Sequence, residues 1–262
     1  MAKAQNRYSA LIEKIFFDGY EDGATSIDFV RNDLKTAASD LGIELPENLG
    51  DVIYSVRFRT PFPASILELQ PEGMEWQIEL AGRARYRFSL VKLSRIVPNP
   101  ELVTISVPDA TPEIIRRYTL DDEQALLAIV RYNRLLDIFL GITTYSMQNH
   151  LRTTVKGVGQ IEIDEMYVGI DKHGCHYIVP VQAKGGNDKI SVVQTKQDLA
   201  WCGDRFPGMR AKAISVQFMD DDKIAMFDLT VQDDEIKVAE ERHYKLVPAA
   251  DLDDAAIRNY RP

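Results

Sequence analysis

The sequence of 262 residues contains few cysteines, no long apolar segment and no excess of basic side chains. Its two cysteines, Cys175 and Cys202, fit neither a disulfide framework nor a zinc-binding pattern. No apolar run reaches the roughly 18 residues of a membrane-spanning helix, and the first residues are polar where a secretory signal would be apolar. The formal net charge of −9 argues against a protein that coats nucleic acid nonspecifically. We therefore expect a cytoplasmic protein outside the membrane, stabilised by a hydrophobic core.

The composition and the distribution of charge suggest two domains. Hydrophobic residues make up 45% of the chain and charged residues 27%, which are ordinary proportions for a folded protein. A proline-rich stretch at 98–112 is the best boundary, so we expect one domain over residues 1–110 and a second over 111–262. The segment 211–262 is the most acidic part, with 7 basic and 12 acidic side chains. This acidity does not exclude a nuclease, because sites for divalent metals are built from carboxylates.

The N-terminal domain is expected to combine helices with a small sheet. Apolar spacing predicts a helix at 8–17, a second from Ser26 to residue 41, and a short third helix after Asn48. The last two suit a helix-turn-helix as well as an ordinary pair of antiparallel helices. Alternation at 56–58, and from Trp76 to Phe88, predicts strands. The expected fold of this domain is therefore α+β with a helix-turn-helix-like part.

Arginines occupy every second position in these expected strands, so that each row lies on one face of a sheet. Arginine makes bidentate contacts with phosphates and with guanine edges, and we expect this face to bind DNA. The alternative is a solvent-exposed face that glutamates neutralise. The expected DNA-binding residues of this domain are Arg57, Arg59, Arg83, Arg85 and Arg87.

The second domain has the pattern of an α/β fold, in which a long helix precedes a series of strands. A turn at 171–174 is expected to join the first two strands into a hairpin. The pattern predicts helices at 121–140, 145–152 and 197–206, and strands at 160–169, 176–184, 213–219, 223–230 and 236–247, the last at a sheet edge.

Polar residues gather at one end of this hairpin. Glu162 and Asp164 share one face of the first strand because side chains alternate, and Gln182 and Lys184 share one face of the second. Folding the hairpin brings Asp164 opposite Gln182 and Lys184. A carboxylate and an amide oxygen are hard ligands suited to Mg²⁺, and a nearby lysine can orient a metal-bound water, as phosphodiester hydrolysis requires. The alternative is a hairpin whose polar side chains face solvent.

An acid followed about eighteen residues later by Gln-x-Lys, at the end of an apolar strand, resembles the motif of the PD-(D/E)XK nuclease superfamily. The glutamine is similar to the Mrr-like branch, where it replaces the usual glutamate. The order of the expected elements over roughly 115–230 is similar to the αβββαβ core of that superfamily. The resemblance implies that Asp164 and Gln182 bind Mg²⁺, for which Mn²⁺ can substitute, and that the backbone carbonyl of Ala183 is a further ligand. It also implies that Lys184 is the catalytic lysine.

Further candidate residues surround the motif. Many members of the superfamily place an acidic residue on the first core helix, and Glu123 occupies a comparable stretch. Glu162 is a second candidate for an extra ligand, because it lies on the face of Asp164. Gln194 and Lys196 follow a Gly-Gly break, close to where a substrate phosphate would lie.

Together these features favour a Mg²⁺-dependent endodeoxyribonuclease of the restriction type that acts on foreign double-stranded DNA. We expect a homodimer, because two cuts per duplex require two sites, and no organic cofactor. One alternative is a noncatalytic DNA-binding or regulatory protein on a nuclease fold, which is suggested by Gln182 in place of an acid and by the acidic C-terminal end. Others are a nuclease that processes junctions or RNA, and a protein-interaction module suggested by the acidic segment 211–262.

Overall fold

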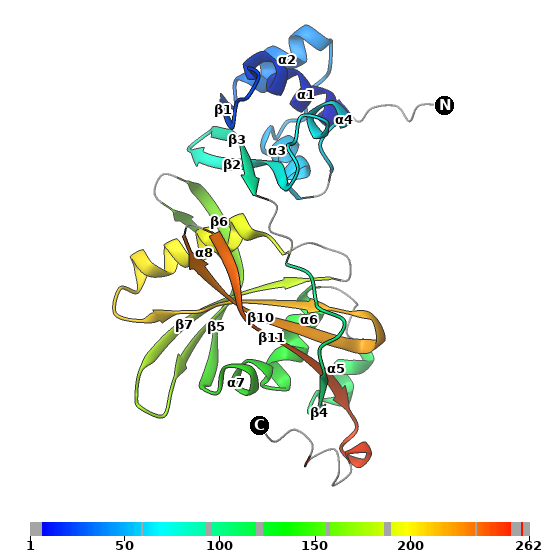
Figure 1. The fold of residues 1–262 in the computed structure, drawn as a ribbon, viewed down its shortest axis with the longest axis vertical. Coiled ribbons are helices and arrows are strands. Elements are labelled where there is room, and N and C mark those ends of the chain that lie inside the picture. The colour runs from blue at the N-terminus through cyan, green and yellow to red at the C-terminus, as the bar shows by residue number, and fades with distance from the viewer. Residues whose placement is uncertain are drawn as a thin grey trace. The chain divides into compact units, whose positions relative to one another are not determined.

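The computed structural model describes residues 7–58, 60–92, 96–118, 123–155, 158–185, 190–233, 235–252 and 258. They form two compact units (Figure 1), one containing residues up to 93 together with 155–159, and the other containing the rest. The division near residue 93 differs from the expected boundary after residue 110. Its reason is long-range pairing: the strand β4 (Thr104–Pro108) lies parallel to β11 (Glu235–Val247) and belongs to the second unit.

The first unit places helices around a three-stranded antiparallel sheet with strand order β1-β3-β2. The ring of Phe16 lies edge-on to Trp76 and Phe88, with centroids 5.0 and 5.2 Å away, and these rings form the centre of a buried aromatic core. The elements are α1 (Arg7–Gly19), β1 (Ser26–Val30), α2 (Asp33–Leu41), α3 (Gly50–Phe58), α4 (Ala64–Leu67), β2 (Met74–Gly82) and β3 (Arg85–Lys92).

Two predictions for this unit were wrong. The single helix expected from Ser26 to residue 41 is strand β1 followed by helix α2, because Ile27 and Phe29 alternate into the core and β1 pairs with β3. The strand expected at 56–58 is the end of helix α3, whose buried Val52, Ile53 and Val56 follow helical spacing. The helix at 8–17 and the strands between Trp76 and Phe88 are confirmed.

The second unit is built on a mixed sheet whose described strands follow the order β4-β11-β10-β9-β7-β6-β5, with β8 beside β7. β6 and β7 are antiparallel, and β7 and β9 are parallel. The further strands are β5 (Thr143–Val155), β6 (Gly159–Ile170), β7 (His176–Lys184), β8 (Arg210–Ala211), β9 (Ala213–Phe218) and β10 (Lys223–Gln232). The helices are α5 (Glu113–Tyr118), α6 (Glu123–Tyr132), α7 (Leu135–Leu140) and α8 (Val192–Arg205), and short 3₁₀ turns span Asp220–Asp222 and Ala249–Asp251.

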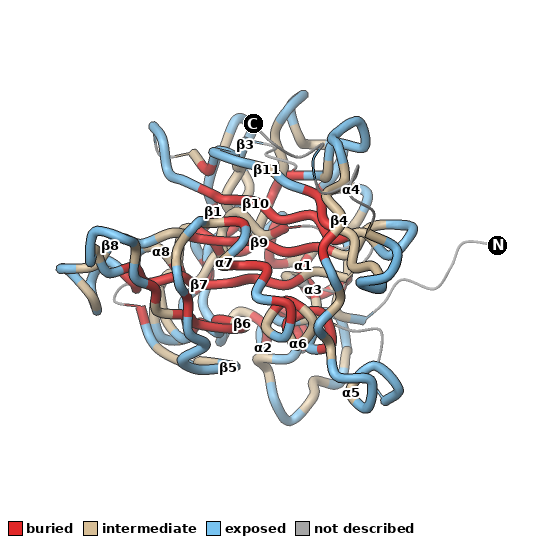
Figure 2. Tube along the Cα trace, turned by 90° about the horizontal axis from the view of Figure 1, so that it is seen from below, coloured by how far each residue is buried: buried red, intermediate tan, exposed pale blue. Residues whose placement is uncertain are grey.

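Helices cover both faces of the central strands. Alternation along β9 sends Ala213 to the cluster that contains Leu199 of α8, and its neighbour Ile214 to the cluster that contains Leu126 and Leu136 of α6 and α7. The chain is therefore mixed α/β, and β7, β9 and β10 are buried between two helical layers. Figure 2 shows the buried residues following these strands.

The elements of the second unit confirm some predictions and correct others. The strands expected at 160–169 and 176–184 are β6 and β7. The helix expected at 121–140 begins outside the described residues and is divided into α6 and α7, because Arg134 takes a left-handed φ of 50°. The helix expected at 145–152 is strand β5, and β11 is not an edge strand because it pairs with both β10 and β4. Within the described ranges, no helix is long and apolar enough to cross a membrane.

Candidate functional site

The candidate site lies where the pairing of β6 with β7 stops. Paired residues run from Ile170 and His176 to Glu165 and Val181, although both strands continue beyond that point. The next residue of β6 is Asp164, and its Oδ2 accepts the backbone N–H of Ala183 at 3.0 Å. The carboxylate thus takes the place of a strand partner and is held rigidly beside the end of β7.

Lys184 points into this cluster rather than into bulk solvent. Its Nζ donates to Oε1 of Glu123 at 3.2 Å, and only 17% of its side chain is exposed. Glu123 is the first residue of α6, the helix that precedes strands β5 to β7. The contact therefore places this acid beside the Gln-x-Lys segment at the end of β7. Burial raises the pKa of Asp164, while the Lys184 charge and the Ala183 N–H act in the opposite direction.

Gln182 is buried, and its amide is hydrogen-bonded at both ends. Its Nε2 donates to Oε1 of Gln194 at 2.6 Å, and its Oε1 accepts the hydroxyl of Ser215, the residue paired with it on β9, at 3.3 Å. The oxygen expected to bind metal therefore faces Ser215. Gln194, expected as a phosphate contact, lies within the cluster and also donates to the backbone oxygen of Glu162 at 3.4 Å. Ala183, expected to contribute its carbonyl oxygen, contributes its N–H to Asp164.

The side chain of Glu162 is engaged with the neighbouring strand β5. Its Oε1 lies 3.1 Å from Nδ1 of His150, and its Oε2 accepts Nε of Arg152 at 3.2 Å. Its negative charge still raises the pKa of Asp164, but the structure gives it surface partners rather than a position between Asp164 and Lys184. Lys196 is half-buried on α8.

Asp198 on α8 joins the cluster and was missed by the sequence analysis. It is 3% exposed, and its Oδ1 has no hydrogen-bond partner among the described residues. Burial raises its pKa well above the usual value, the charge of Asp164 adds to this, and the charge of Lys184 opposes it. One signal was available, because Gln194 and Asp198 are four residues apart and share a helix face. The helix had been predicted to begin at residue 197, after Gln194, which hid this relation.

The cluster offers hard oxygen donors of the kind that Mg²⁺ prefers. They are the carboxylates of Asp164 and Asp198, together with the amide oxygen of Gln182, which in this structure accepts the hydroxyl of Ser215. Within the described part of the chain, no group of three or more histidine, cysteine, aspartate or glutamate side chains is arranged to hold a metal alone. Burial raises the pKa of Asp164 and of Asp198, whereas the charge of Lys184, which is hydrogen-bonded to Glu123, lowers both. The oxygen donors are therefore of the type that a hard divalent cation takes.

The opposite face of β6 carries a separate buried ion pair. Glu165 is 0% exposed, and its Oε1 accepts Nε and Nη2 of Arg131 at 2.9 and 2.8 Å. The hydroxyl of Ser146 on β5 donates to the same carboxylate at 2.5 Å. This pair joins α6 to the sheet and lies on the face away from Asp164, as alternation requires.

The arginines expected to bind DNA do not form one face. Arg57 lies on helix α3, and burial lowers the pKa of its guanidinium, while Arg59 falls outside the described residues. Arg85 and Arg87 are exposed on one face of β3, but Arg87 is paired with Asp28 at 2.6 Å and holds the pKa of that acid below its usual value. Arg83 is exposed in the turn before β3.

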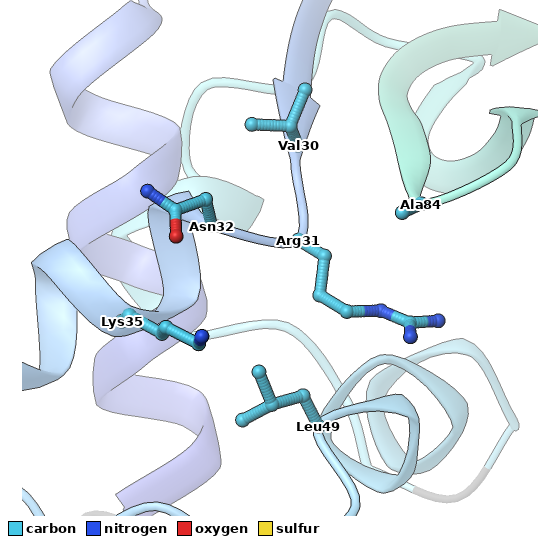
Figure 3. Close-up of a pocket in the computed structure, with 6 residues that line it drawn as sticks. All are labelled: Val30, Arg31, Asn32, Lys35, Leu49 and Ala84. Carbon is cyan, nitrogen blue, oxygen red and sulfur yellow. The ribbon is translucent and has the colours of Figure 1, made fainter.

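A hollow of about 330 Å³, open to solvent and mostly apolar in its lining, lies beside this turn in the first unit (Figure 3). We call it the basic hollow because its two charged residues, Arg31 and Lys35, are both cations. The guanidinium of Arg31 donates to the hydroxyl of Tyr86 at 3.3 and 3.4 Å, and Lys35 extends from the first turn of α2. Both cations are exposed, and neither has an acidic partner among the described residues. The hollow is lined by Val30, Arg31, Asn32, Lys35, Leu49 and Ala84.

Comparisons of the chain with protein-family models, with curated proteins and with solved structures gave no match. No family is therefore assigned to it. The function is inferred from the residues of the cluster and of the basic hollow.

Proposed function

We propose that this chain is a metal-dependent endonuclease that hydrolyses phosphodiester bonds in double-stranded DNA. The observation that carries the proposal is the meeting of Asp164, Gln182 and Lys184 where the pairing of β6 with β7 ends. A carboxylate, an amide oxygen and a poorly exposed ammonium group are the types of group that hold a divalent cation and a phosphate. A divalent cation and a phosphate group supply the charges that such a cluster accommodates.

In this proposal each residue of the cluster has a distinct role. Asp164 and Gln182 hold Mg²⁺ or Mn²⁺, which when bound polarises a phosphoryl oxygen and lowers the pKa of a water molecule. Lys184 holds its positive charge close to the attacked phosphate and donates a hydrogen bond to it or to the attacking water. Glu123 fixes the position of the Lys184 ammonium through the 3.2 Å contact.

The order of elements around the cluster supports the same proposal. Helices α6 and α7 precede the neighbouring strands β5, β6 and β7, and α8 leads from β7 towards the parallel strand β9. This succession agrees with the αβββαβ core that the resemblance to PD-(D/E)XK nucleases implies. By the same resemblance, we propose a restriction-type role and a homodimer that cuts both strands.

The basic hollow of the first unit is the proposed contact with the DNA backbone. Arg31 and Lys35 present positive charge without acidic partners in the described chain, and Arg83 and Arg85 flank Ala84 on its border. Contacts with phosphates position a protein on a duplex and dominate its salt dependence.

The test is cleavage of a plasmid with Mg²⁺ or Mn²⁺ by the wild-type protein and by Lys184→Ala and Asp164→Asn. Each substitution is expected to lower the cleavage rate at least about 100-fold, because it removes a charge at the reacting phosphate. Lys172→Ala changes an exposed lysine of the β6–β7 turn and is expected to cleave like wild type. Equal nicking by the wild type and by both site variants would reject the catalytic proposal.

A noncatalytic DNA-binding protein is the second candidate. It is favoured because both ends of the Gln182 amide are already hydrogen-bonded, to Gln194 and to Ser215, instead of being directed to a metal. It predicts salt-dependent DNA binding without cleavage of modified or unmodified duplexes. Branched DNA and RNA included in the same substrate panel separate a junction- or RNA-processing nuclease from a restriction-type enzyme.

A further inference from the structure

Asp198 is an unusual residue for the interior of a helix that packs on a sheet. Helix α8 lies against β7 and β9, and Asp198 is almost wholly inaccessible on it, with one carboxylate oxygen unpartnered among the described residues. A buried carboxylate without a hydrogen bond costs several kcal/mol unless a cation or a proton compensates it. Such a group is compensated either by its own protonation or by a cation that the protein itself does not provide.

The position of Asp198 directs it to the cluster already described. Gln194 lies one helical turn before it, and the amide of Gln194 is hydrogen-bonded to Gln182. The same side of α8 thus carries the amide of Gln194, which reaches Gln182 of β7 and the backbone of β6, and the acid of Asp198. The charges of Asp164 and Lys184 both act on Asp198, as expected for groups that lie near one another.

The neighbouring polar groups leave Asp198 available for a ligand. The hydroxyl of Thr195 donates to the backbone oxygen of Ser191 at 3.0 Å, and the amide nitrogen of Gln182 donates to Gln194. Among the described residues, Lys184 is the cation that acts on both Asp164 and Asp198, and its ammonium is hydrogen-bonded to Glu123. A hard divalent cation satisfies two buried carboxylates at once.

We propose that Asp198 is an additional ligand of the divalent cation at this site, contributed by α8 and opposite Asp164 of β6. The proposal rests on the proposed function and names a residue that the sequence motif does not contain. Asp198 supplies the second negative charge that the site lacks because Gln182 stands where an acid is usual. The ligand class is Mg²⁺ or Mn²⁺, held by oxygen atoms alone.

Binding of Mn²⁺ to the full-length protein tests this role directly. Calorimetric titration, together with the electron paramagnetic resonance signal of free Mn²⁺, gives affinity and stoichiometry for the wild type, Asp198→Asn and Asp164→Asn. We expect Asp198→Asn to weaken Mn²⁺ binding at least 10- to 100-fold, since even indirect partners of a metal contribute that much. Asp204→Asn is the matched control, because it makes the same change at an exposed position of the same helix, and it is expected to bind like wild type.

Thermal unfolding separates a ligand from a residue that is only structural. Without metal, Asp198→Asn is expected to melt at or above the wild-type temperature, because it removes a buried unpaired carboxylate. With Mn²⁺, the wild type is expected to gain stability and Asp198→Asn to gain little. A variant that melts lower without metal, and is stabilised by Mn²⁺ as strongly as wild type, would overturn the proposal.

Hydrogen exchange of the wild type provides a test that needs no variant. Mg²⁺ is expected to slow amide exchange in α8 as well as in β6 and β7, and protection confined to the strands would overturn the role of Asp198.

Two further outcomes separate this proposal from the proposed function. If Asp198→Asn binds Mn²⁺ as tightly as the wild type and the wild type cleaves DNA, the role of Asp198 as a ligand is rejected and the proposed nuclease activity stands. If Mn²⁺ binding depends on Asp198 but the wild type cleaves no substrate, the role of Asp198 as a ligand stands and the proposed nuclease activity is rejected.

Discussion

At the scale of single residues, the buried ion pair between Arg131 and Glu165 is expected to be costly to break. Glu165 is 0% exposed and contacts two nitrogens of the guanidinium, whereas the Arg131 side chain is 37% exposed. Removing one partner of such a pair leaves the other charge buried and uncompensated, which costs more than the pair contributes when intact.

Arg131→Met is accordingly expected to lower the free energy of unfolding by about 3 kcal/mol, the lower end of the range for buried pairs because water reaches Arg131. Urea unfolding of the wild type and the variant measures the difference. Adding Glu165→Gln to Arg131→Met removes the uncompensated negative charge and should recover part of the lost free energy of unfolding. A loss below about 1 kcal/mol in the single variant would show that Glu165 is protonated or otherwise compensated.

The two cysteines are expected to differ sharply in reactivity. Cys202 is 0% exposed, and burial raises its pKa to about 12, whereas Cys175 is half-buried near the β6–β7 turn. Because the thiolate is the reactive form, one thiol should react with an aromatic disulfide reagent at about pH 8 in the folded protein, and the second only after denaturation. Cys175→Ser should abolish the reaction of the folded state. Equal rates for both thiols would contradict the burial of Cys202.

At the scale of elements, the turn between β2 and β3 contains a strained residue. Ala84 has a φ of 57°, in the left-handed region where a Cβ atom is unfavourable. Ala84→Gly is expected to stabilise the first unit by about 1 kcal/mol in thermal or urea unfolding. The matched change Ala81→Gly, within strand β2, should instead destabilise by roughly 0.5–1 kcal/mol. If Ala84→Gly lowers the free energy of unfolding, the methyl group of Ala84 stabilises the unit by more than its left-handed backbone conformation destabilises it.

How well an element could be predicted depended on where its stabilising contacts lie. The limits of β7 were predicted correctly, because a continuous apolar run from Tyr177 to Val181 is buried by helices on both faces. Strand β5 was predicted as a helix, because it is mostly exposed and shows no alternation of apolar residues. β1 was read as part of a helix, since the strand exists through its pairing with β3, more than fifty residues away.

The same distinction applies within the candidate site. Asp164, Gln182 and Lys184 lie on two adjacent strands joined by a short turn, so alternation alone was enough to group them. Glu123 was named from its place on a helix, and the structure brings it to Lys184 through a contact across 61 residues. Asp198 was not singled out, because one acid in a helix is usually exposed and the expected helix began after Gln194, which concealed the helix face that the two residues share.

At the scale of the whole molecule, the net charge of −9 opposes a general attraction to DNA. The proposed DNA binding must therefore depend on a local group of cations, and the basic hollow is the proposed one. Arg31→Ala combined with Lys35→Ala is expected to weaken duplex binding and to reduce the slope of log affinity against log salt by about 2, near 1 per phosphate contact.

Fluorescence anisotropy with a labelled duplex over a salt series measures this slope. Lys172→Ala, a change of charge on the β6–β7 turn, serves as the control and should leave the slope unchanged. An unaltered slope in the double variant would place the phosphate contacts on another surface of the protein.

The Ala183 amide donates a hydrogen bond to Asp164. This bond gives the acid a structural role at the end of β7 that does not depend on the proposed catalysis. An alanine at position 164 would leave a main-chain N–H of β7 without an acceptor, whereas asparagine keeps one. A descendant of this chain that had lost the proposed hydrolytic activity would therefore still be selected to keep an acceptor at position 164. The Lys184 side chain instead donates to Glu123, so its loss during evolution would be the more sensitive sign that the proposed activity had gone.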